Sequence, residues 1–295
     1  MNKRYELKDY AETVNAYLEK VIPVCNFGEE VVHEAMKYSL SIGGKRIRPV
    51  LVLEFCRICG GNIDDALPLA AALEMIHTYS LIHDDLPCMD DDDMRRGMPS
   101  CHIKYGYEYA LLAGDGLLTA AFGVIVDSEF ARKNPTAAIK AVSLLSTLAG
   151  ANGMIGGQVI DLKNENRKAD METLRKMDEL KTGALIKCGA LLGCIAAGAN
   201  EEKISAAATY AEKIGQAFQI VDDILDVTGD EQSLGKPIGS DKESGKSTYV
   251  TLLGIEKAQE YADRLTDEAV EALGVFGDEN KFLKELAYKL AKREN

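Results

Sequence analysis

The sequence predicts an all-α protein, and three observations support this. Residues with high helix propensity (Ala, Leu, Glu, Lys and Met) are abundant, whereas only seven prolines and no tryptophan occur in 295 residues. The alternation of β-branched and polar residues that marks strands is nearly absent. Turn signals are spaced so that they leave ten or so helical segments between them. We therefore expect a bundle of roughly ten or more helices.

Taken in order, the longest expected helices cover residues 5–21, 63–83, 108–131, 171–198 and 203–227. The third and fourth contain LLAGDGLLTAAFGVIV and GALIKCGALLGCIAAGA, which are apolar nearly all round and therefore belong in the centre of a bundle. Small residues in the fourth helix, such as Gly189 and Gly193, would let neighbouring helices approach closely. We expect residues 1–295 to form a single domain.

Composition and charge exclude several classes of protein. The net charge of −13 argues against a nucleic-acid surface, which needs clustered positive charge. No run reaches ~18 uncharged apolar residues, so no transmembrane helix and no membrane partner are expected. The charged N-terminal segment lacks the apolar core of a signal peptide. A cytoplasmic location is the default expectation.

The seven cysteines do not predict a disulfide framework, because their number is odd and the chain looks intracellular. Cys56 and Cys59 form a lone CxxC with no second Cys or His pair at metal spacing. Burial of both on one helix is favoured over a redox or zinc role.

The first acidic cluster is HDDLPCMDDDDMRRG, residues 83–97, in which six aspartates lie within ten residues. It ends an apolar helix, and Pro87 interrupts it. Six carboxylates at the end of a hydrophobic helix repel one another unless cations neutralise them. Carboxylate oxygens without His or Cys partners suit a hard ion such as Mg²⁺.

The second acidic cluster is FQIVDDILD, residues 218–226. On a helical wheel Asp222, Asp223 and Asp226 share a face with Phe218 and Gln219, and the back of the helix is apolar. Two carboxylate faces in one helical core predict cations held between them. Mg²⁺ prefers a few carboxylates plus phosphate oxygens, so the implied ligand is a diphosphate.

Basic residues complement these clusters. In GGKRIRP, Lys45 and Arg48 stand three apart, which places them on one face at the expected start of a helix, where a glycine pair and a helix N-terminus favour anions. His77 lies seven residues before Asp84 and almost directly below it on the wheel. Two further loops, GKP and SGKS, carry Lys236 and Lys246. The second loop lacks the first glycine and the strand of a P-loop, so a nucleotide site is not predicted.

These motifs, together with GGQVIDL and KTGALI, occur in the order seen in trans-isoprenyl diphosphate synthases, and the resemblance spans about residues 30 to 255. The resemblance implies a helical bundle around a deep cavity, normally in a homodimer. It also implies that the substrates are isopentenyl diphosphate and an allylic diphosphate, and that three Mg²⁺ ions bind in each active site.

The resemblance assigns roles to individual residues. The implied metal ligands are Asp84, Asp85, Asp90, Asp222, Asp223 and Asp226. The implied contacts to the allylic diphosphate are Arg95, Lys181, Lys236 and Lys246. The implied site for isopentenyl diphosphate comprises Lys45, Arg48, His77 and Arg96. Thr182 and Gln219 would direct their oxygens toward the developing allylic cation.

The resemblance also bears on the product. A bulky residue five positions before the first aspartate, here Tyr79, resembles the farnesyl type. The helical wheel, however, places Tyr79 about 140° from Asp84 and Ser80 only about 40° away. A geranylgeranyl or geranyl product stays open if Tyr79 points away from the cavity. A terpene cyclase and a non-catalytic subunit are alternatives of another class, which the Lys45/Arg48 pair and the two intact acidic motifs disfavour.

Overall fold

The computed structural model describes residues 6–22, 27–164, 167, 169–229 and 247–292. It is almost wholly helical, which confirms the predicted fold class. Its first helices are α1 (Leu7–Val21), α2 (Glu30–Ser41), α3 (Ile47–Ile58) and α4 (Ile63–Asp84), followed by the hairpin strands β1 (Met94–Arg95) and β2 (Met98–Pro99). Next come α5 (Cys101–Tyr105), α6 (Tyr107–Val126), α7 (Glu129–Lys133), α8 (Pro135–Ala149) and α9 (Met154–Asn164). The remaining elements are α10 (Met171–Asp178), the π-helical turn η1 (Glu179–Gly183), α11 (Ala184–Ala197), α12 (Glu201–Thr228), α15 (Tyr249–Leu253), α16 (Ile255–Ala272), the 3₁₀ segment η2 (Leu273–Asn280) and α17 (Lys281–Lys292).

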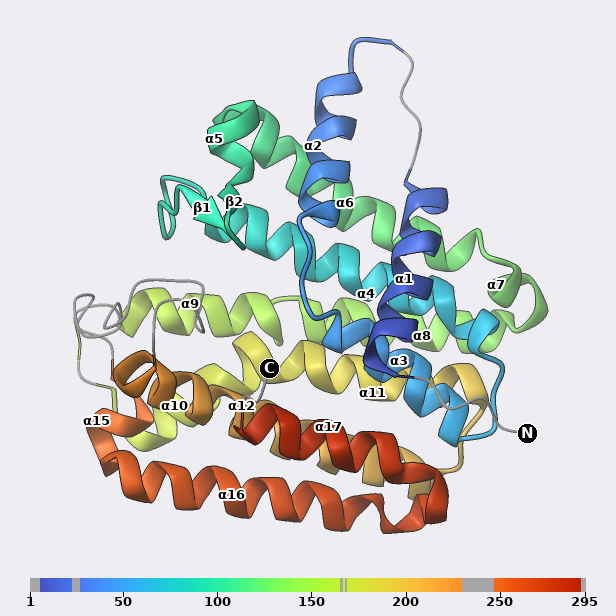
Figure 1. Cartoon of the computed structure of the whole chain (residues 1–295). Helices are drawn as coiled ribbons and strands as arrows, with labels where there is room; N and C mark the ends of the chain where they lie inside the picture. Colours follow the sequence, from blue (N-terminus) through green and yellow to red (C-terminus); the bar gives the residue numbers. More distant parts are fainter. Residues whose placement is uncertain (1–5, 23–26, 165–166, 168, 230–246, 293–295) are drawn as a thin grey trace.

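The long helices lie roughly side by side, and α1 and α2 run across them (Figure 1). The most extensive packing joins α12 to α16, α4 to α6 and α11 to α3. The hairpin that follows α4 and the helix α15 that follows α12 lie at the same end of the bundle, on the left in Figure 1. The ends of the two helices that carry the acidic clusters are thereby directed toward one region.

Glycines let α11 pack directly against the backbone of α3, as the small residues in its sequence predict. A Cβ atom added at Gly193 would lie 2.4 Å from the carbonyl oxygen of Val52. One added at Gly189 would lie 2.8 Å from the carbonyl oxygen of Arg48. Any larger residue at either position would push the two helices apart.

Two of the expected helices are interrupted. The segment 108–131 breaks after Val126, because the Ser128 side chain accepts the N–H of Ala131 at 3.1 Å and so caps a new helix. The segment 171–198 contains the π-helical turn η1 at residues 179–183. Turns of this kind are frequent at functional sites.

Three helical stretches in the described part of the chain are long and apolar enough to cross a membrane, judged by length and composition alone. They cover Tyr107–Val126, Pro135–Asn164 and Met171–Ala197. The expectation from the sequence counted only stretches free of charge, whereas these stretches contain up to two charged residues, so the prediction of no transmembrane helix stays a prediction. Only 33% of the apolar window of Tyr107–Val126 is buried in the bundle.

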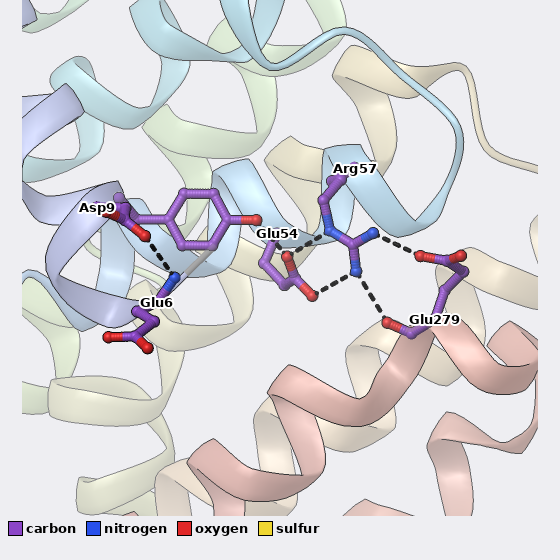
Figure 2. A network of polar contacts seen from close by, with 6 residues as sticks. Glu6, Asp9, Glu54, Arg57 and Glu279 are labelled. Atoms are coloured by element: carbon purple, nitrogen blue, oxygen red, sulfur yellow. Dashed lines mark hydrogen bonds and ion pairs between the residues drawn. The ribbon is translucent and has the colours of Figure 1, made fainter. Parts of the chain in front are cut away.

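A polar network ties the N-terminal helix and the C-terminal region to α3 (Figure 2). The Tyr10 hydroxyl donates to the buried Glu54 carboxylate at 2.5 Å. Arg57 donates to both oxygens of Glu54, at 2.9 and 3.0 Å, and to the backbone carbonyl of Glu279 at 2.9 Å. The Glu54 side chain is only 1% exposed, so its charge depends on these two donors.

We expect Arg57→Ala to lower the free energy of unfolding by roughly 2–4 kcal/mol, because it leaves a buried carboxylate without its cation. Urea titration would measure this loss. Glu12→Ala, which removes only the exposed pair with Lys8, is the matched control and should cost less than about 0.5 kcal/mol. If the two substitutions had equal effects, burial of the Glu54 carboxylate would not be what makes its pairing with Arg57 important for stability.

A second buried contact joins α10 to α15. Asp178 is 5% exposed, and its carboxyl hydrogen-bonds with the Tyr249 side chain. Its other oxygen, Oδ2, has no hydrogen-bond partner among the described residues. Burial, reinforced by the nearby Asp161 and Asp222 carboxylates, raises the pKa of Asp178 to about 7, against the lowering effect of Tyr249 and Lys181.

The stability of the protein should therefore depend on pH through Asp178. Between the unfolded pKa near 4 and the folded pKa near 7 the folded state binds more protons, so stability falls as pH rises through this window and levels off above it. Asp178→Asn stays neutral throughout. Urea titration at several pH values measures the free energy of unfolding of both proteins. The difference between Asp178→Asn and the wild type should shift in favour of the variant by about a few kcal/mol from the low to the high end of the window. Parallel curves for the two proteins would refute the raised pKa.

Candidate active site

The first acidic cluster surrounds the end of α4. Asp84 is the last residue of that helix, and its backbone carbonyl accepts the N–H of Asp90 at 2.8 Å. Burial raises the pKa of Asp84 to about 6; the Asp90 and Asp85 carboxylates add to the rise, and Lys181 and Arg95 oppose it. The carboxylates are thus crowded in a partly desolvated place, where a cation would relieve the repulsion.

Lys181 supplies one positive charge at this place. It lies on the π-helical turn η1, and its Nζ contacts Asp161 Oδ2 at 2.5 Å. Burial lowers the pKa of Lys181, but the attraction of Asp161, Asp84 and Asp90 outweighs it, so the pKa is raised overall. Lys181 is therefore a permanent cation between α9 and the end of α4.

The second acidic cluster reaches the same place from α12. Asp226 is 2% exposed, and Asp223 Oδ2 accepts the backbone N–H of Tyr249 at 2.7 Å. Asp178 interacts electrostatically with Asp222 on one side and with Lys181 on the other. Lys181 also interacts with Asp84, so Asp178 and Lys181 link the two acidic clusters electrostatically.

The predicted basic site also forms in part. Arg48 Nη1 lies 3.3 Å from His77 Nε2, and Arg96 donates to the carbonyl of Gly43. Burial, then the charges of Arg48 and Arg96, hold the pKa of His77 well below its usual range, so His77 is neutral and its Nε2 accepts from Arg48. The Nε of Arg48 is buried with no hydrogen-bond partner in the described part of the structure. Arg48 and Arg96 give this place positive charge, which the nearby Glu74 carboxylate offsets in part.

The expected placement of Lys45 on a helix face with Arg48 is wrong. Helix α3 begins at Ile47, after Arg46, whose backbone is left-handed with φ of 52°. Lys45 therefore precedes the helix and is exposed. Arg46 adopts this conformation because its buried guanidinium pairs with Glu74 at 2.6 Å, which turns the chain sharply before the helix.

Arg95 and Arg96 are set by the β1–β2 hairpin. The turn residues Arg96 and Gly97 have φ of 52° and 76°, the positive values of a tight two-residue hairpin turn. Arg95 pairs with the buried Asp85 and also contacts Asp92 at 3.4 Å. Asp85, predicted as a metal ligand, is thus held by the guanidinium that was predicted to hold a diphosphate.

A cavity of about 480 Å³ opens between these charged groups and the apolar core. Both Tyr79 and Ser80 line it, so the wheel angle did not exclude Tyr79. The Tyr79 ring stands edge-on to His83, with centroids 5.6 Å apart, and is itself 5% exposed. Other lining residues include Arg48, His77, Asp84, Leu118, Met154, Gln158, Val159, Leu162, Lys181 and Thr182. The cavity therefore has a charged rim and a mainly apolar interior.

The remaining predicted residues have mixed outcomes. Thr182 lines the cavity next to Lys181. Gln219 is half-buried on α12 and is not among the residues that line the cavity. Lys236 and Lys246 lie outside the described residues.

The sequence reasoning missed Gln158, Asp161 and Asp178. The first two stand three apart on α9, in the segment GGQVIDL, and both face the site: Gln158 lines the cavity and Asp161 pairs with Lys181. The signal was present, because two polar residues at helical spacing interrupt an apolar run. The second glycine of this segment, Gly157, has a structural reason: a Cβ atom there would lie 2.1 Å from the backbone nitrogen of Lys181.

The donor set suits Mg²⁺. The predicted ligands are all carboxylates, which are the oxygen donors that a hard cation prefers. Among the described residues no three His, Cys, Asp or Glu side chains form a ready metal cage. The residues that would hold Mg²⁺ are the predicted ligands Asp84, Asp85 and Asp90 and the three aspartates of α12.

Comparison with known proteins places this geometry in a family. The polyprenyl synthetase profile matches residues 29–282. A geranylgeranyl pyrophosphate synthase of Capsicum annuum chloroplasts is 45% identical over 93% of this chain and 74% of its own length. The farnesyl diphosphate synthase of Escherichia coli (strain K12) is 43% identical over 91% of this chain and 90% of its own length.

A solved structure agrees over nearly the whole fold. The crystal structure of an FPP/GFPP synthase from Zymomonas mobilis superposes with a TM-score of 0.87 at 35% identity, covering 97% of both chains. The family profile, over residues 29–282, spans both acidic clusters, the basic loop and the π-helical turn. The chain belongs to the polyprenyl synthetase family and is a prenyltransferase of the trans-prenyl diphosphate synthase type.

Proposed function

We propose that the protein condenses isopentenyl diphosphate with dimethylallyl diphosphate and then with geranyl diphosphate to give (2E,6E)-farnesyl diphosphate. The observation that carries this product is the position of Tyr79, whose ring forms part of the wall of the 480 Å³ cavity. A bulky ring in that wall limits the length of the prenyl chain that the cavity accepts.

The distribution of charge supports the reaction. Arg48 and Lys181 line the cavity, and Arg96 interacts electrostatically with Arg48. These three cations would bind and orient the diphosphate groups of two substrates. Asp84 and the aspartates of α12 would hold Mg²⁺, which when bound neutralises the diphosphate that leaves. The hydrocarbon tail would point into the apolar interior, which is lined by buried residues such as Met154 and Leu185 and shields the tail from water.

The chemistry then needs no protein nucleophile. The allylic C–O bond breaks and its electron pair leaves with the diphosphate, whose added charge Lys181 stabilises. The double bond of isopentenyl diphosphate attacks the allylic cation, and the released diphosphate is the base that removes the last proton. Thr182, beside Lys181 on the cavity wall, offers an oxygen dipole to the cation.

A geranylgeranyl product is the second candidate, because the relatives above include enzymes named for each product. Purified protein with isopentenyl and dimethylallyl diphosphates and Mg²⁺, followed by mass analysis, decides between them. Turnover of two substrates also distinguishes a synthase from a terpene cyclase, which would consume farnesyl diphosphate alone. Activity of the single purified chain would exclude a non-catalytic subunit.

Tyr79→Ala should lengthen the products beyond fifteen carbons, because it removes the ring from the cavity wall. Mass spectrometry of the products measures the change. Tyr109→Ala, an exposed tyrosine on α6, is the matched control and should leave chain length unaltered. An unchanged product from Tyr79→Ala would show that another residue sets the length.

Asp84→Ala and Asp222→Ala should each lower turnover by at least ~10²-fold, typical for the loss of a preorganised electrostatic element. A chelator should abolish wild-type turnover, and added Mg²⁺ should restore it. Asp93→Ala tests the same acidic run at an exposed position outside the predicted ligands, and should stay near wild type. Near-normal turnover of Asp84→Ala or Asp222→Ala would mean that the metal site lies elsewhere.

We also propose that the protein is a homodimer that pairs through α6. Leu112, Thr119, Phe122 and Val126 form one stripe on the outer side of that helix, and Leu112 and Val126 are 49% and 54% exposed. An apolar stripe of this kind is typical of a subunit interface. The resemblance to a family of homodimers supports a second copy as the occupant.

Leu112→Glu should therefore convert a dimer to monomers in sedimentation velocity, because it places charge in the interface. Val275→Glu, at an exposed apolar position on η2, is the control and should keep the wild-type mass. A monomeric wild-type protein would overturn the proposal.

A further inference from the structure

Two cysteines that the proposed reaction does not use lie in contact at the far ends of two helices. Cys59 is the residue that ends α3, and Cys194 lies in the last turn of α11. Their Sγ atoms are 3.9 Å apart. Closing this gap to a disulfide bond length of about 2.05 Å requires a movement of about 1.9 Å. Both helix ends are followed by a glycine with positive φ, Gly60 at 90° and Gly198 at 65°, so the chain is not locked by a continuing helix.

We propose that Cys59 and Cys194 are a peroxide-sensitive thiol pair that oxidises to a disulfide linking α3 to α11. The pairing differs from the CxxC motif seen in the sequence. Cys56 and Cys59 stand three apart along α3, where Cβ atoms are about 5–6 Å apart, wider than the ~3.5–4.5 Å of a disulfide. Cys56 is moreover buried, and its thiol donates to the carbonyl of Asn62 at 3.4 Å.

The surroundings give the two thiols different roles. Cys59 is partly exposed, whereas Cys194 is buried. The contact with Cys194 lowers the pKa of Cys59, burial opposes this, and the nearby Lys203 lowers it further. Cys59 is therefore the thiol that reacts first, since the thiolate is the nucleophile. A cavity of about 460 Å³, lined in part by Lys133, Lys140 and Cys194, brings solvent close to the pair.

The chemistry balances with a hydroperoxide as oxidant. The Cys59 thiolate attacks one oxygen of the O–O bond and becomes a sulfenic acid. The hydroxide that leaves takes up the proton that the thiol had lost and forms the first water. The Cys194 thiol then displaces that hydroxyl as a second water and forms the S–S bond. Two thiols and one hydrogen peroxide thus give one disulfide and two waters. The crosslink lies at the opposite end of α3 from Arg48, so it fixes the two helices without entering the active site.

Peptide mapping of the full-length protein tests the proposal directly. After hydrogen peroxide treatment, digestion without reductant should yield a Cys59–Cys194 crosslinked peptide, and the intact mass should fall by two hydrogens. The thermal midpoint should rise by ~4 °C or more and return with reductant, because the bond closes a long loop. Detection of Cys56–Cys59 instead, or intact Cys59 and Cys194 thiols when the exposed Cys88 is already oxidised, would overturn it.

Variants separate the pair from the other thiols. Cys59→Ser and Cys194→Ser should each lose both the mass change and the rise in thermal midpoint. Cys188→Ser, at a buried position on the same helix as Cys194, should keep both. A shift that survives in Cys59→Ser would contradict the assignment. Mapping of the wild-type protein decides the question even if a variant fails to fold.

Discussion

The charge of Lys181 is the constraint on which the site depends. Its ammonium group contacts Asp161 and interacts electrostatically with Asp84. Asp178 interacts electrostatically both with Lys181 and with Asp222 of the acidic motif on α12. Carboxylates crowded in a half-buried region repel one another and shift toward their neutral forms. One fixed cation offsets part of this repulsion and leaves room for divalent ions to supply the remainder. The two acidic helices can therefore end at the same place.

The backbone around Lys181 is shaped to permit this. The π-helical turn η1 widens the helix by one residue and directs Lys181 and Thr182 toward the cavity. Gly157 lets α9 approach the backbone of that turn, and so brings Asp161 within reach of the ammonium. The irregular turn and the glycine are parts of one arrangement, because a side chain at 157 would separate the ion pair.

Around this centre the bundle separates three environments. Carboxylates lie at the ends of α4 and α12, guanidinium groups come from the start of α3 and from the β1–β2 hairpin, and apolar side chains fill the space between the helices. A substrate with a diphosphate head and a hydrocarbon tail matches all three. The apolar sequence of α6 has two uses, because its inner face packs on α4 and its outer stripe stays exposed. That dual role explains why a helix in a bundle has the composition of a membrane span.

The sequence by itself determined the fold class, both acidic motifs and most of the basic residues, because helical periodicity and charge runs are local properties. It could not show that Arg46 turns the chain before α3, that Arg95 pairs with Asp85, or that Asp161 is the partner of Lys181. Each of these contacts joins residues on different elements, so only packing brings them together. The position of Tyr79 is of the same kind: its wheel angle pointed away from Asp84, and the neighbouring helices α6 and α9 placed it on the cavity wall. Local spacing fixed which groups are present, and the tertiary structure decided which of them meet, because a side chain's neighbours are set by the helices that pack around it.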